Sequence, residues 1–340
     1  MRVLVSGYLG FGNLGDEAIF AGLARGLAAR GHEVTALSAD PAATRDQHGV
    51  AARHRLLGLP WALGASDALV SGGGGLLQDA TSHRSLRYYL GVIRAARATG
   101  ARVAVFAQSI GPLSPRGRGA VGRALAGLPI AVRDEPSRRL LTDLGLEAAL
   151  VADTALALPM PPVRRIGGVL LVPRADVPGA RAALVAVARD ALAAGVSVGV
   201  LPLQRGADEA DADAIVAAAP GARRRVADGP GSALARCAEV DTVASVRLHG
   251  LILALRAGRG HVGVGYDPKV AGFAEQSGAA VVPVPVETEA LRRALAAASP
   301  PDEARRRALL ARAEAGLDWL DAALREPGRR HRTAGGGGAG

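Results

Sequence analysis

The sequence predicts an α/β protein with two doubly wound parallel-sheet domains that face each other across a cleft. Three observations lead to this prediction. Short apolar runs alternate with helical patterns, a proline-rich stretch interrupts the alternation once, and 340 residues exceed the size of one ordinary core. Short strands buried on both faces and separated by helices are typical of a parallel sheet with right-handed crossovers.

The first half of the chain should form a Rossmann-like domain over residues 1–157. We expect strands at residues 2–6, 33–37, 68–71, 103–107 and 130–132. Helical patterns fall between them at residues 16–30, 86–99 and 137–144.

The stretch "LALPMPPVRRIGG", residues 156–168, breaks regular structure with its prolines and indicates a linker at 158–166. A second Rossmann-like domain should follow over residues 167–300, and a C-terminal helix over 301–326. Its strands are expected at residues 169–172, 196–201, 242–245 and 262–264. Helices of this half are expected at residues 180–194, 208–218, 248–256, 291–298 and 302–324. Residues 327–340 have no apolar face to bury, so we expect a disordered tail.

Composition limits the possible classes of protein. Cys237 is the one cysteine, which excludes an internal disulfide and favours the cytoplasm. The opening run MRVLVSG is too short for a signal peptide, and no uncharged apolar run is long enough to span a membrane. The net charge of +10 fits a solvated arginine surface, an anionic substrate or an anionic membrane. Aromatic residues make up 3%, too few for the interleaved pattern of single-strand binders, so no nucleic-acid partner is expected.

Two glycine-rich loops follow predicted strands, where α/β sheets bind ligands. In "GYLGFGNLGDE", residues 7–17, Gly12 permits close approach and Asn13 and Asp16 add polar groups. Asp16 can serve as a helix N-cap, as a functional carboxylate, or both. In "SGGGGLLQD", residues 71–79, Gly73 and Gly74 belong to a run of glycines that permits close approach, and Gln78 and Asp79 follow with an amide and a carboxylate that suit sugar hydroxyls. The alternative is a merely flexible loop.

Two further strand ends carry polar residues. The loop "AQSIGPL" covers residues 107–113, and in "VRDEPS" Arg133 ends a strand while Asp134 or Ser137 can cap the next helix. A surface ion pair is the alternative explanation of Arg133.

The stretch "SVRLHG", residues 245–250, puts Arg247 and His249 near a helix N-terminus, where an anion is favoured. One strand later, "GYDPKV" contains Lys269, the single lysine among 41 basic residues. Pro268 suits the first turn of the following helix, so Lys269 is expected to point into the same pocket as His249.

Together, "GYLGFGNLGDEAI", "SGGGGLLQDATSHRS", "QSIGP", "VRDEPS", "SVRLHGL" and "GYDPKV" resemble the polysaccharide pyruvyl transferases of the CsaB type. The resemblance covers about residues 1–275. It implies two Rossmann-like halves arranged as in GT-B glycosyltransferases, and transfer of pyruvate from phosphoenolpyruvate to a sugar. The CsaB type forms a 4,6-ketal on N-acetylmannosamine of a lipid-linked cell-wall precursor, whose product helps to anchor S-layer proteins. Other pyruvyl transferases modify galactose or glucuronic acid.

The resemblance also implies roles for residues. Phosphoenolpyruvate would meet Arg133, Arg247, His249 and Lys269. The acceptor sugar would lie near Gly12, Asn13, Asp16, Gly73, Gly74, Gln78 and Asp79. Ser109 stands where many relatives have glycine. A lipid-linked acceptor implies a peripheral contact with the inner face of the membrane.

Ketal formation requires protonation of the methylene carbon, addition of two hydroxyls and departure of phosphate. His249 is our candidate acid and Asp16 our candidate base. Lys269 would hold the phosphate or supply the proton itself. No step demands a metal or other cofactor, and no cluster with metal-ligand spacing occurs in the sequence.

Two other functions compete with this interpretation. A GT-B glycosyltransferase would share the architecture, but the helix after "RLHG" lacks the carboxylate that such enzymes use to bind ribose. A non-catalytic sugar-binding module would not need the cations at Arg247, His249 and Lys269.

Overall fold

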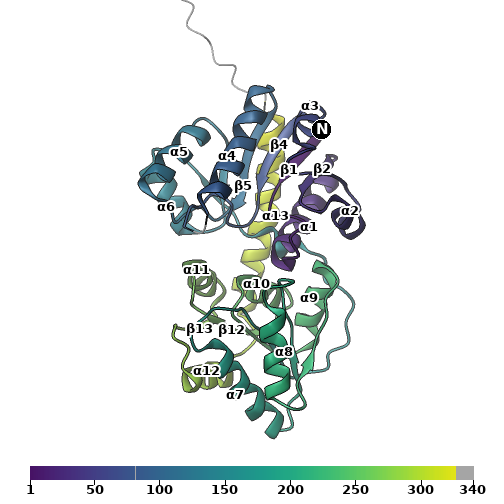
Figure 1. Ribbon diagram of the computed structural model, residues 1–340, viewed down its shortest axis with the longest axis vertical. Helices are drawn as coiled ribbons and strands as arrows, with labels where there is room; N and C mark the ends of the chain where they lie inside the picture. Colours follow the sequence, from purple (N-terminus) through teal and green to yellow (C-terminus); the bar gives the residue numbers. More distant parts are fainter. Residues whose placement is uncertain (81, 327–340) are drawn as a thin grey trace, which may run out of the picture.

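The computed structural model describes residues 1–80 and 82–326, and it contains two α/β domains stacked along the long axis (Figure 1). In the described part of the first domain, seven parallel strands follow the order β3-β2-β1-β4-β5-β6-β7. Their bounds are β1 Arg2–Ser6, β2 Glu33–Ser38, β3 Ala51–His54, β4 Ala68–Gly72, β5 Arg102–Gln108, β6 Ile130–Val132 and β7 Ala149–Leu150.

The strand order determines which helices cover which face. The chain winds outward from β1 through β3, crosses back to β4 and continues to β7. Right-handed crossovers therefore put α1 and α2 on one face and α3 to α6 on the other. These helices are α1 Leu14–Ala29, α2 Pro41–His48, α3 Leu59–Gly64, α4 His83–Ala98, α5 Pro115–Leu125 and α6 Glu135–Asp143, and a 3₁₀ turn, η1 Thr154–Ala157, ends the domain.

The second domain repeats this construction. Six parallel strands follow the order β10-β9-β8-β11-β12-β13 within the described residues. They are β8 Val169–Val172, β9 Val198–Val200, β10 Arg223–Arg224, β11 Thr242–Ser245, β12 Gly260–Val264 and β13 Ala280–Val282. The helices are α7 Ala180–Ala193, α8 Glu209–Ala218, α9 Pro230–Glu239, α10 Leu248–Arg256, α11 Pro268–Ser277, α12 Thr288–Ala296 and α13 Glu303–Arg325.

The predicted fold class is confirmed, because both sheets are parallel and doubly wound. The prediction missed several elements: α2, β3, α3, α5, β7, β10, α9 and β13. Most are short, and β7 and β10 have two residues each, so they carry too little periodicity to detect. The predicted tail, residues 327–340, lies outside the described residues. No described helix is long and apolar enough to cross a membrane.

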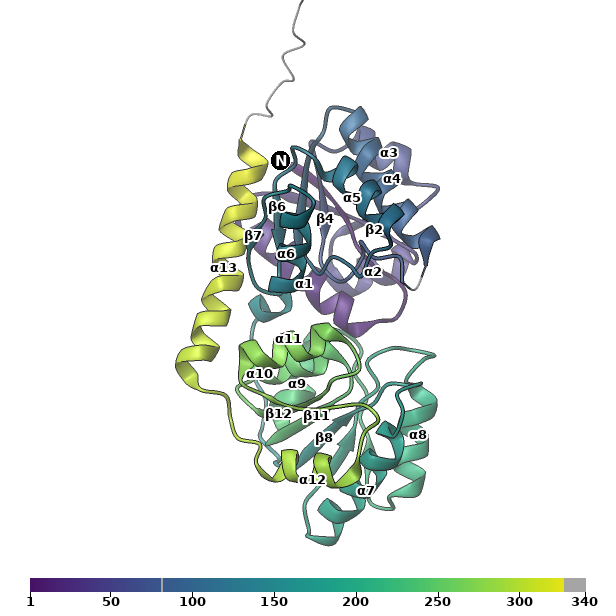
Figure 2. The same ribbon diagram turned by 90° about the vertical axis from the view of Figure 1, so that its left-hand side faces the viewer.

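Helix α13 returns from the second domain and packs along the first (Figure 2). Leu317, Leu320 and Leu324 are buried in the core formed with α1 and the first sheet. The first domain makes room for this helix, because a Cβ added at Gly26 would lie 2.5 Å from Leu317 Cδ1.

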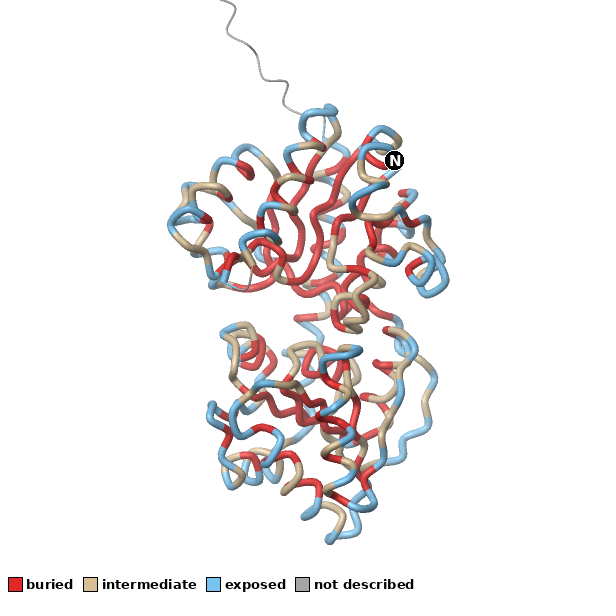
Figure 3. Tube along the Cα trace, viewed as in Figure 1, coloured by how far each residue is buried: buried red, intermediate tan, exposed pale blue. Residues whose placement is uncertain are grey.

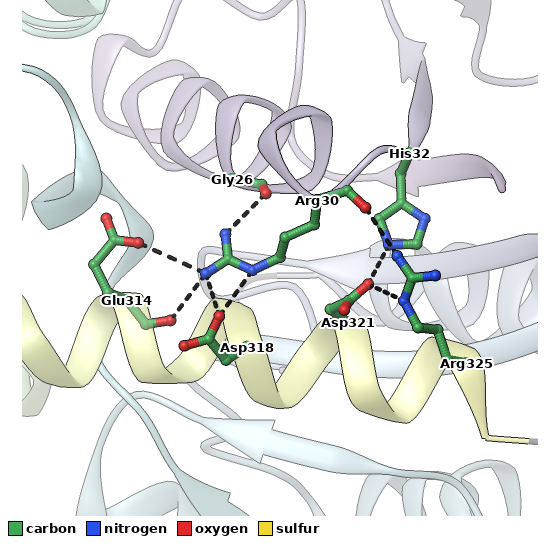
Figure 4. A network of polar contacts seen from close by, with 7 residues as sticks. All are labelled: Gly26, Arg30, His32, Glu314, Asp318, Asp321 and Arg325. Carbon is green, nitrogen blue, oxygen red and sulfur yellow. Dashed lines mark hydrogen bonds and ion pairs between the residues drawn. The ribbon is translucent and has the colours of Figure 1, made fainter.

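Polar contacts flank this apolar seam (Figure 4). Arg30 Nη2 lies 2.6 Å from Asp318 Oδ1, and the Nε2 of buried His32 lies 2.7 Å from Asp321 Oδ1. Arg325 bonds the same Asp321 carboxylate and donates to the Arg30 carbonyl. The chain therefore joins the two domains twice, through the linker and through α13.

Replacing Leu320 with alanine should lower the free energy of unfolding by about 2–4 kcal/mol, because a fully buried side chain is removed from the seam. Urea denaturation measures this loss. Arg325→Gln removes a partly exposed ion pair and one exposed bond to the Arg30 carbonyl, and should cost only about 1 kcal/mol. Equal losses would show that the apolar seam does not dominate α13 docking.

Candidate active site

The first glycine loop leads directly into α1. Asn13 caps this helix, with its Oδ1 accepting a hydrogen bond from the Gly15 N–H at 3.0 Å. The suggested cap role of Asp16 is therefore wrong, because the helix begins at Leu14 and places Asp16 in its first turn. Asn13 Nδ2 instead donates to Asp16 Oδ2 at 2.6 Å and orients that carboxylate.

Asp16 is an unusual carboxylate for the start of a helix. Burial raises its pKa to about 6, although the positive charges of His249 and Arg133 oppose the shift. Part of the group is therefore neutral near neutral pH, which suits a residue that exchanges protons.

The four-glycine run "SGGGG" makes room for functional side chains. A Cβ at Gly73 would lie 2.0 Å from Ile19 Cγ2, and one at Gly74 would lie 2.6 Å from Asp16 Oδ1. A Cβ at Gly75 would lie 2.5 Å from Lys269 Nζ. Close approach, and not flexibility alone, explains the run.

Lys269 reaches from the second domain to this loop of the first. Asp267 caps α11 by accepting the Lys269 N–H at 2.9 Å, and Pro268 occupies the first turn as predicted. Within the described residues, no carboxylate lies within 4.0 Å of Nζ. Burial lowers the pKa of Lys269, and the charge of Arg133 adds to this effect. The ammonium is thus partly desolvated and has no ion-pair partner among these residues.

Asp153 lies at the centre of a buried charged group that joins the domains. Arg133 Nη1 donates to Asp153 Oδ2, and His249 Nε2 lies 3.7 Å from the same oxygen. Burial alone would raise the pKa of Asp153, but Arg133 and His249 outweigh burial and hold it below its usual value. Since the side chains of Arg133 and Asp153 are 7% and 3% exposed, the suggested surface ion pair of Arg133 is wrong.

His249 fits against the start of α1. A Cβ at Gly15 would lie 2.2 Å from His249 Nδ1, so only glycine leaves space for the ring. The imidazole is therefore held between Gly15 and Asp153, both of which belong to the first domain.

Ser109 extends the charged group. It accepts from Arg133 Nε at 2.8 Å and donates to Asp134 Oδ2 at 2.5 Å. The other Asp134 oxygen accepts the Ser137 N–H at 2.9 Å, so Asp134 caps α6 as anticipated. Ser109 thus has a defined place in this network.

Arg247 differs from Lys269 in having a carboxylate of its own. Its Nε donates to Asp208 Oδ2 at 2.9 Å, and its Nη2 donates to the other oxygen of this fully buried side chain. Asp208 also accepts the Gln204 N–H at 3.0 Å. The charge of Arg247 is thus balanced inside the second domain, which leaves less of it for an anionic ligand.

Asp79 and Gln78 lie in different surroundings. Both oxygens of buried Asp79 accept from Ser114, at 2.8 Å from its N–H and 2.5 Å from its hydroxyl. This pairing gives Asp79 a structural role before α5. Gln78 lines the cleft together with Gly75.

The first glycine loop is also bonded to the second domain. The Leu14 N–H donates to the Leu203 carbonyl at 2.8 Å, and the Arg205 N–H donates to the Gly12 carbonyl at 2.9 Å. These two bonds form an antiparallel bridge between Asn13 and Gln204. Gly12 therefore has a role in joining the domains, since Arg205 Cβ would lie 2.9 Å from a Cβ there.

A cleft of about 650 Å³ opens between the domains. The residues that line it include Gly75, Gln78, Ser109, Arg118, Asp134, Tyr266 and Lys269. Beneath it, a cavity of about 20 Å³ touches Arg133, Asp153 and Lys269 and has room for about one water molecule. In the part of the chain that the structure describes, no group of three or more His, Cys, Asp or Glu side chains could hold a metal ion.

Sequence reasoning found most of these residues but missed Asp153. It follows β7, and that strand is too short to mark a strand end in the sequence. The one available signal was a polar Asp-Thr pair directly after the apolar run "AALVA".

Comparison with solved structures places the fold among two-domain GT-B enzymes and the related epimerases. S. aureus MnaA with UDP matches with a TM-score of 0.62 and 9% identity, covering 94% of this chain and 93% of that one. The UDP-GlcNAc 2-epimerase from Neisseria meningitidis bound to UDP-GlcNAc gives 0.60 and 10%, covering 87% and 91%. Acinetobacter baumannii MurG gives 0.52 and 14%, covering 96% and 100%. At these identities the likeness shows the fold alone.

The sequence itself gives the narrower assignment. It matches the polysaccharide pyruvyl transferase family over residues 13–268, more than half of the chain. The chain therefore belongs to this family, which assigns it to the transferases and to polysaccharide pyruvylation in general. Comparison with curated protein sequences found no match.

Replacing Asp16 with asparagine should stabilise the protein above pH 6. The folded carboxyl has a pKa of about 6, above the unfolded value, so native stability falls as pH rises through about 4 to 6. Asparagine avoids this loss and should gain about 1–3 kcal/mol at pH 8 but little at pH 4. Thermal unfolding at both pH values measures the difference.

Asp67→Asn is the matched control with the opposite sign. Its hydrogen bond with Arg2 lowers the Asp67 pKa to about 2, so its removal should destabilise the protein at pH 8. If the Asp16→Asn protein is less stable than wild type at pH 8, the ionised Asp16 carboxylate does not destabilise the folded protein, and the raised pKa is contradicted.

Proposed function

We propose that the protein transfers pyruvate from phosphoenolpyruvate to two hydroxyls of one sugar, forming a cyclic ketal and releasing phosphate. The observation that carries this proposal is the ammonium of Lys269, which has no ion-pair partner among the described residues and lies against Gly75 in the cleft, beside the group formed by Arg133, Asp153 and His249. Phosphoenolpyruvate carries a phosphate and a carboxylate, so it needs a concentration of positive charge.

The charges of the candidate residues support different roles. Arg133 and Arg247 are each balanced by a buried aspartate, whereas no carboxylate lies within 4.0 Å of Lys269 in the described chain. Lys269 is thus the cation best suited to take the phosphate. Arg133 and Arg247 would orient phosphoenolpyruvate by hydrogen bonds. Their charges attract it less, because each is already balanced by an aspartate.

His249 is the proposed proton donor to the methylene carbon, and Asp153 is proposed to position it from 3.7 Å. Protonation makes the central carbon electrophilic, one sugar hydroxyl adds there, the bond to phosphate oxygen breaks, and the second hydroxyl closes the ring. Each hydroxyl loses a proton: Asp16 is the proposed base for the first, and the departing phosphate carries away the second. Its raised pKa and its bond to Asn13 support this role. No cofactor is part of this scheme.

The proposed acceptor lies on the side of the glycine loops, near Asp16, Gly74 and Gln78. From the sequence resemblance we propose the CsaB type of reaction, a 4,6-ketal on N-acetylmannosamine of a lipid-linked cell-wall precursor made in the cytoplasm.

The direct test mixes the enzyme with phosphoenolpyruvate and a lipid-diphosphate disaccharide that ends in N-acetylmannosamine. Mass spectrometry should find an adduct heavier by one pyruvic acid less one water, with equimolar phosphate released. His249→Ala should abolish this turnover while the circular dichroism spectrum remains that of the folded protein, with a lowered thermal midpoint because Asp153 loses a charged neighbour.

Acceptors that end in galactose or glucuronic acid separate the donor from the acceptor assignment. Turnover with only a galactose or a glucuronic acid acceptor would mean that this sugar, and not N-acetylmannosamine, is the acceptor. If no acceptor led to release of phosphate, pyruvyl transfer from phosphoenolpyruvate would be refuted. Calorimetric binding of a UDP-sugar would instead favour the glycosyltransferase alternative.

Lys269→Arg should raise the KM for phosphoenolpyruvate at least tenfold, because a planar guanidinium is larger than the ammonium that Gly75 accommodates. Gly75→Ala should also raise the KM for phosphoenolpyruvate. It should not lower the thermal midpoint, since the added Cβ would meet only the flexible end of Lys269. Steady-state kinetics measure both effects.

Gly231→Ala is the control, because nothing lies within 4 Å of a Cβ at that position. Wild-type kinetics for Lys269→Arg would mean that any cation serves at position 269.

A further inference from the structure

The surface of the first domain over α3, α4 and α5 is basic and lacks acidic residues, whereas α6 on the same side of the sheet carries Glu135 and Asp143. Between Asp79 and Asp134 the sequence contains nine arginines and no aspartate or glutamate. Helices α4 and α5 occupy much of this stretch, and they lie with α3 on the same side of the first sheet (Figure 2). We call this surface, formed by α3, α4 and α5, the basic face.

The arginines of the basic face point to solvent. Those that are exposed and form no ion pair with another described residue are Arg84, Arg87, Arg94, Arg97, Arg116, Arg118 and Arg123. Elsewhere, arginines are commonly paired, as in the clusters around Glu135, Glu239 and Glu303. The unpaired arginines therefore give this face a positive field that nearby carboxylates do not cancel.

The same face also exposes large apolar side chains. Leu56 is 57% exposed, Leu57 88% and Trp61 60%, and the guanidinium of Arg53 lies 4.0 Å from the centre of the Trp61 ring. Aromatic residues make up only 3% of the chain, and this is one of its two tryptophans. Figure 3 shows the exposed segments of this domain in pale blue.

The apolar and basic parts are contiguous. The Tyr88 hydroxyl of α4 donates to the Arg55 carbonyl at 3.0 Å, which joins α4 to the loop that carries Leu56 and Leu57. At the other end of α4, Arg97 donates to the carbonyls of Ala124 and Ala126, at and just beyond the end of α5. The three helices therefore present one continuous surface.

We propose that the basic face docks onto a bilayer that contains anionic phospholipid, with Leu56, Leu57 and Trp61 entering the headgroup region. Leucine and tryptophan beside arginine is the composition of interfacial membrane-binding surfaces. A nucleic acid would bind the arginines through its phosphates but would not bury the exposed leucine side chains. An acidic protein is treated below as an outcome of the test.

Docking of the basic face also determines where the cleft lies relative to the bilayer. Arg118 belongs both to the basic face and to the cleft lining. Arg55 lies 5.2 Å from the Phe11 ring of the first glycine loop, and this loop leads to Asp16. Docking would therefore bring the cleft mouth to the bilayer, within reach of a membrane-borne acceptor. This last step rests on the proposed function, whereas docking itself does not.

Flotation with lipid vesicles tests the proposal. The wild-type protein should bind phosphatidylcholine vesicles that contain phosphatidylglycerol, bind pure phosphatidylcholine far less, and be released by high salt. Replacing Arg84, Arg87 and Arg94 with glutamine should weaken binding roughly 100-fold, at about fivefold for each arginine near a charged membrane. Leu57→Asp combined with Trp61→Ala should weaken it at least tenfold.

Matched variants control for charge and for folding. Arg25, Arg164 and Arg223 are exposed and form no ion pair in the described structure, so their replacement with glutamine removes the same charge elsewhere. Ile166 is 54% exposed in the linker, so Ile166→Asp matches Leu57→Asp. Both controls should bind vesicles like the wild type, and all variants should keep the wild-type thermal midpoint.

Trp61 also reports the depth of insertion. Brominated phospholipids should quench the fluorescence that is lost in Trp61→Phe and should spare the emission of Trp319, which packs near Phe106.

Four results would overturn the proposal. They are no binding to anionic vesicles, equal losses in the control variants, full binding after the Leu57 and Trp61 changes, and stronger binding to polyglutamate or DNA with the same dependence on Trp61. Vesicle binding needs no substrate, so absence of pyruvyl transfer would not affect this result.

Discussion

The Asp153 carboxylate is the interaction on which the arrangement of the two domains depends. It lies in the first domain, pairs with Arg133 of that domain and lies 3.7 Å from His249 of the second. A buried charge is tolerated only when it is paired and hydrogen-bonded, and removing a partner is strongly destabilising. The bond from the Ala155 N–H completes the coordination of Asp153 at the start of η1. The position of His249 relative to Arg133 is therefore coupled to the contact between the domains.

The packing around this charged group reinforces it. One apolar core contains Ala18 of α1, Leu156 of η1, Leu251 of α10 and Leu309 of α13, so it belongs to both domains. The backbone bridge between Asn13 and Gln204 adds two directional bonds on the other side. Two connections of the chain, a shared core and a buried ion group together fix the geometry of the cleft.

Two charged side chains of the candidate site lower the stability of the folded protein. Asp16 is held in surroundings that raise its pKa to about 6, and Lys269 is partly desolvated without a carboxylate within 4.0 Å in the described chain. Charged groups that are not fully compensated cost folding free energy, and they are found where a ligand or a proton transfer compensates them. The glycines of the second loop are part of this arrangement, because they let Asp16 and Lys269 approach the same backbone segment from opposite domains.

The fold class and most of the candidate site could be predicted from residue patterns. Apolar strands separated by helices indicate parallel sheets, and the carboxyl ends of such strands gather their loops, so Asp16, Arg133, His249 and Lys269 could be predicted to lie around one cleft. Pro268 and Asp134 likewise revealed their local roles, because caps and first turns depend on neighbouring residues alone. Family motifs supplied the class of reaction.

Which charges are neutralised depends on contacts between segments that lie far apart in the sequence. Asp153 and Asp208 lie 20 and 39 residues from their arginine partners, and no local pattern encodes such pairs. The same limit applies to Asp79, which could have faced a sugar but accepts bonds from Ser114, and to α13, which returns to the first domain. Local residue patterns fix strands, caps and loops, whereas the partner of a buried charge depends on long-range packing that the local sequence does not express.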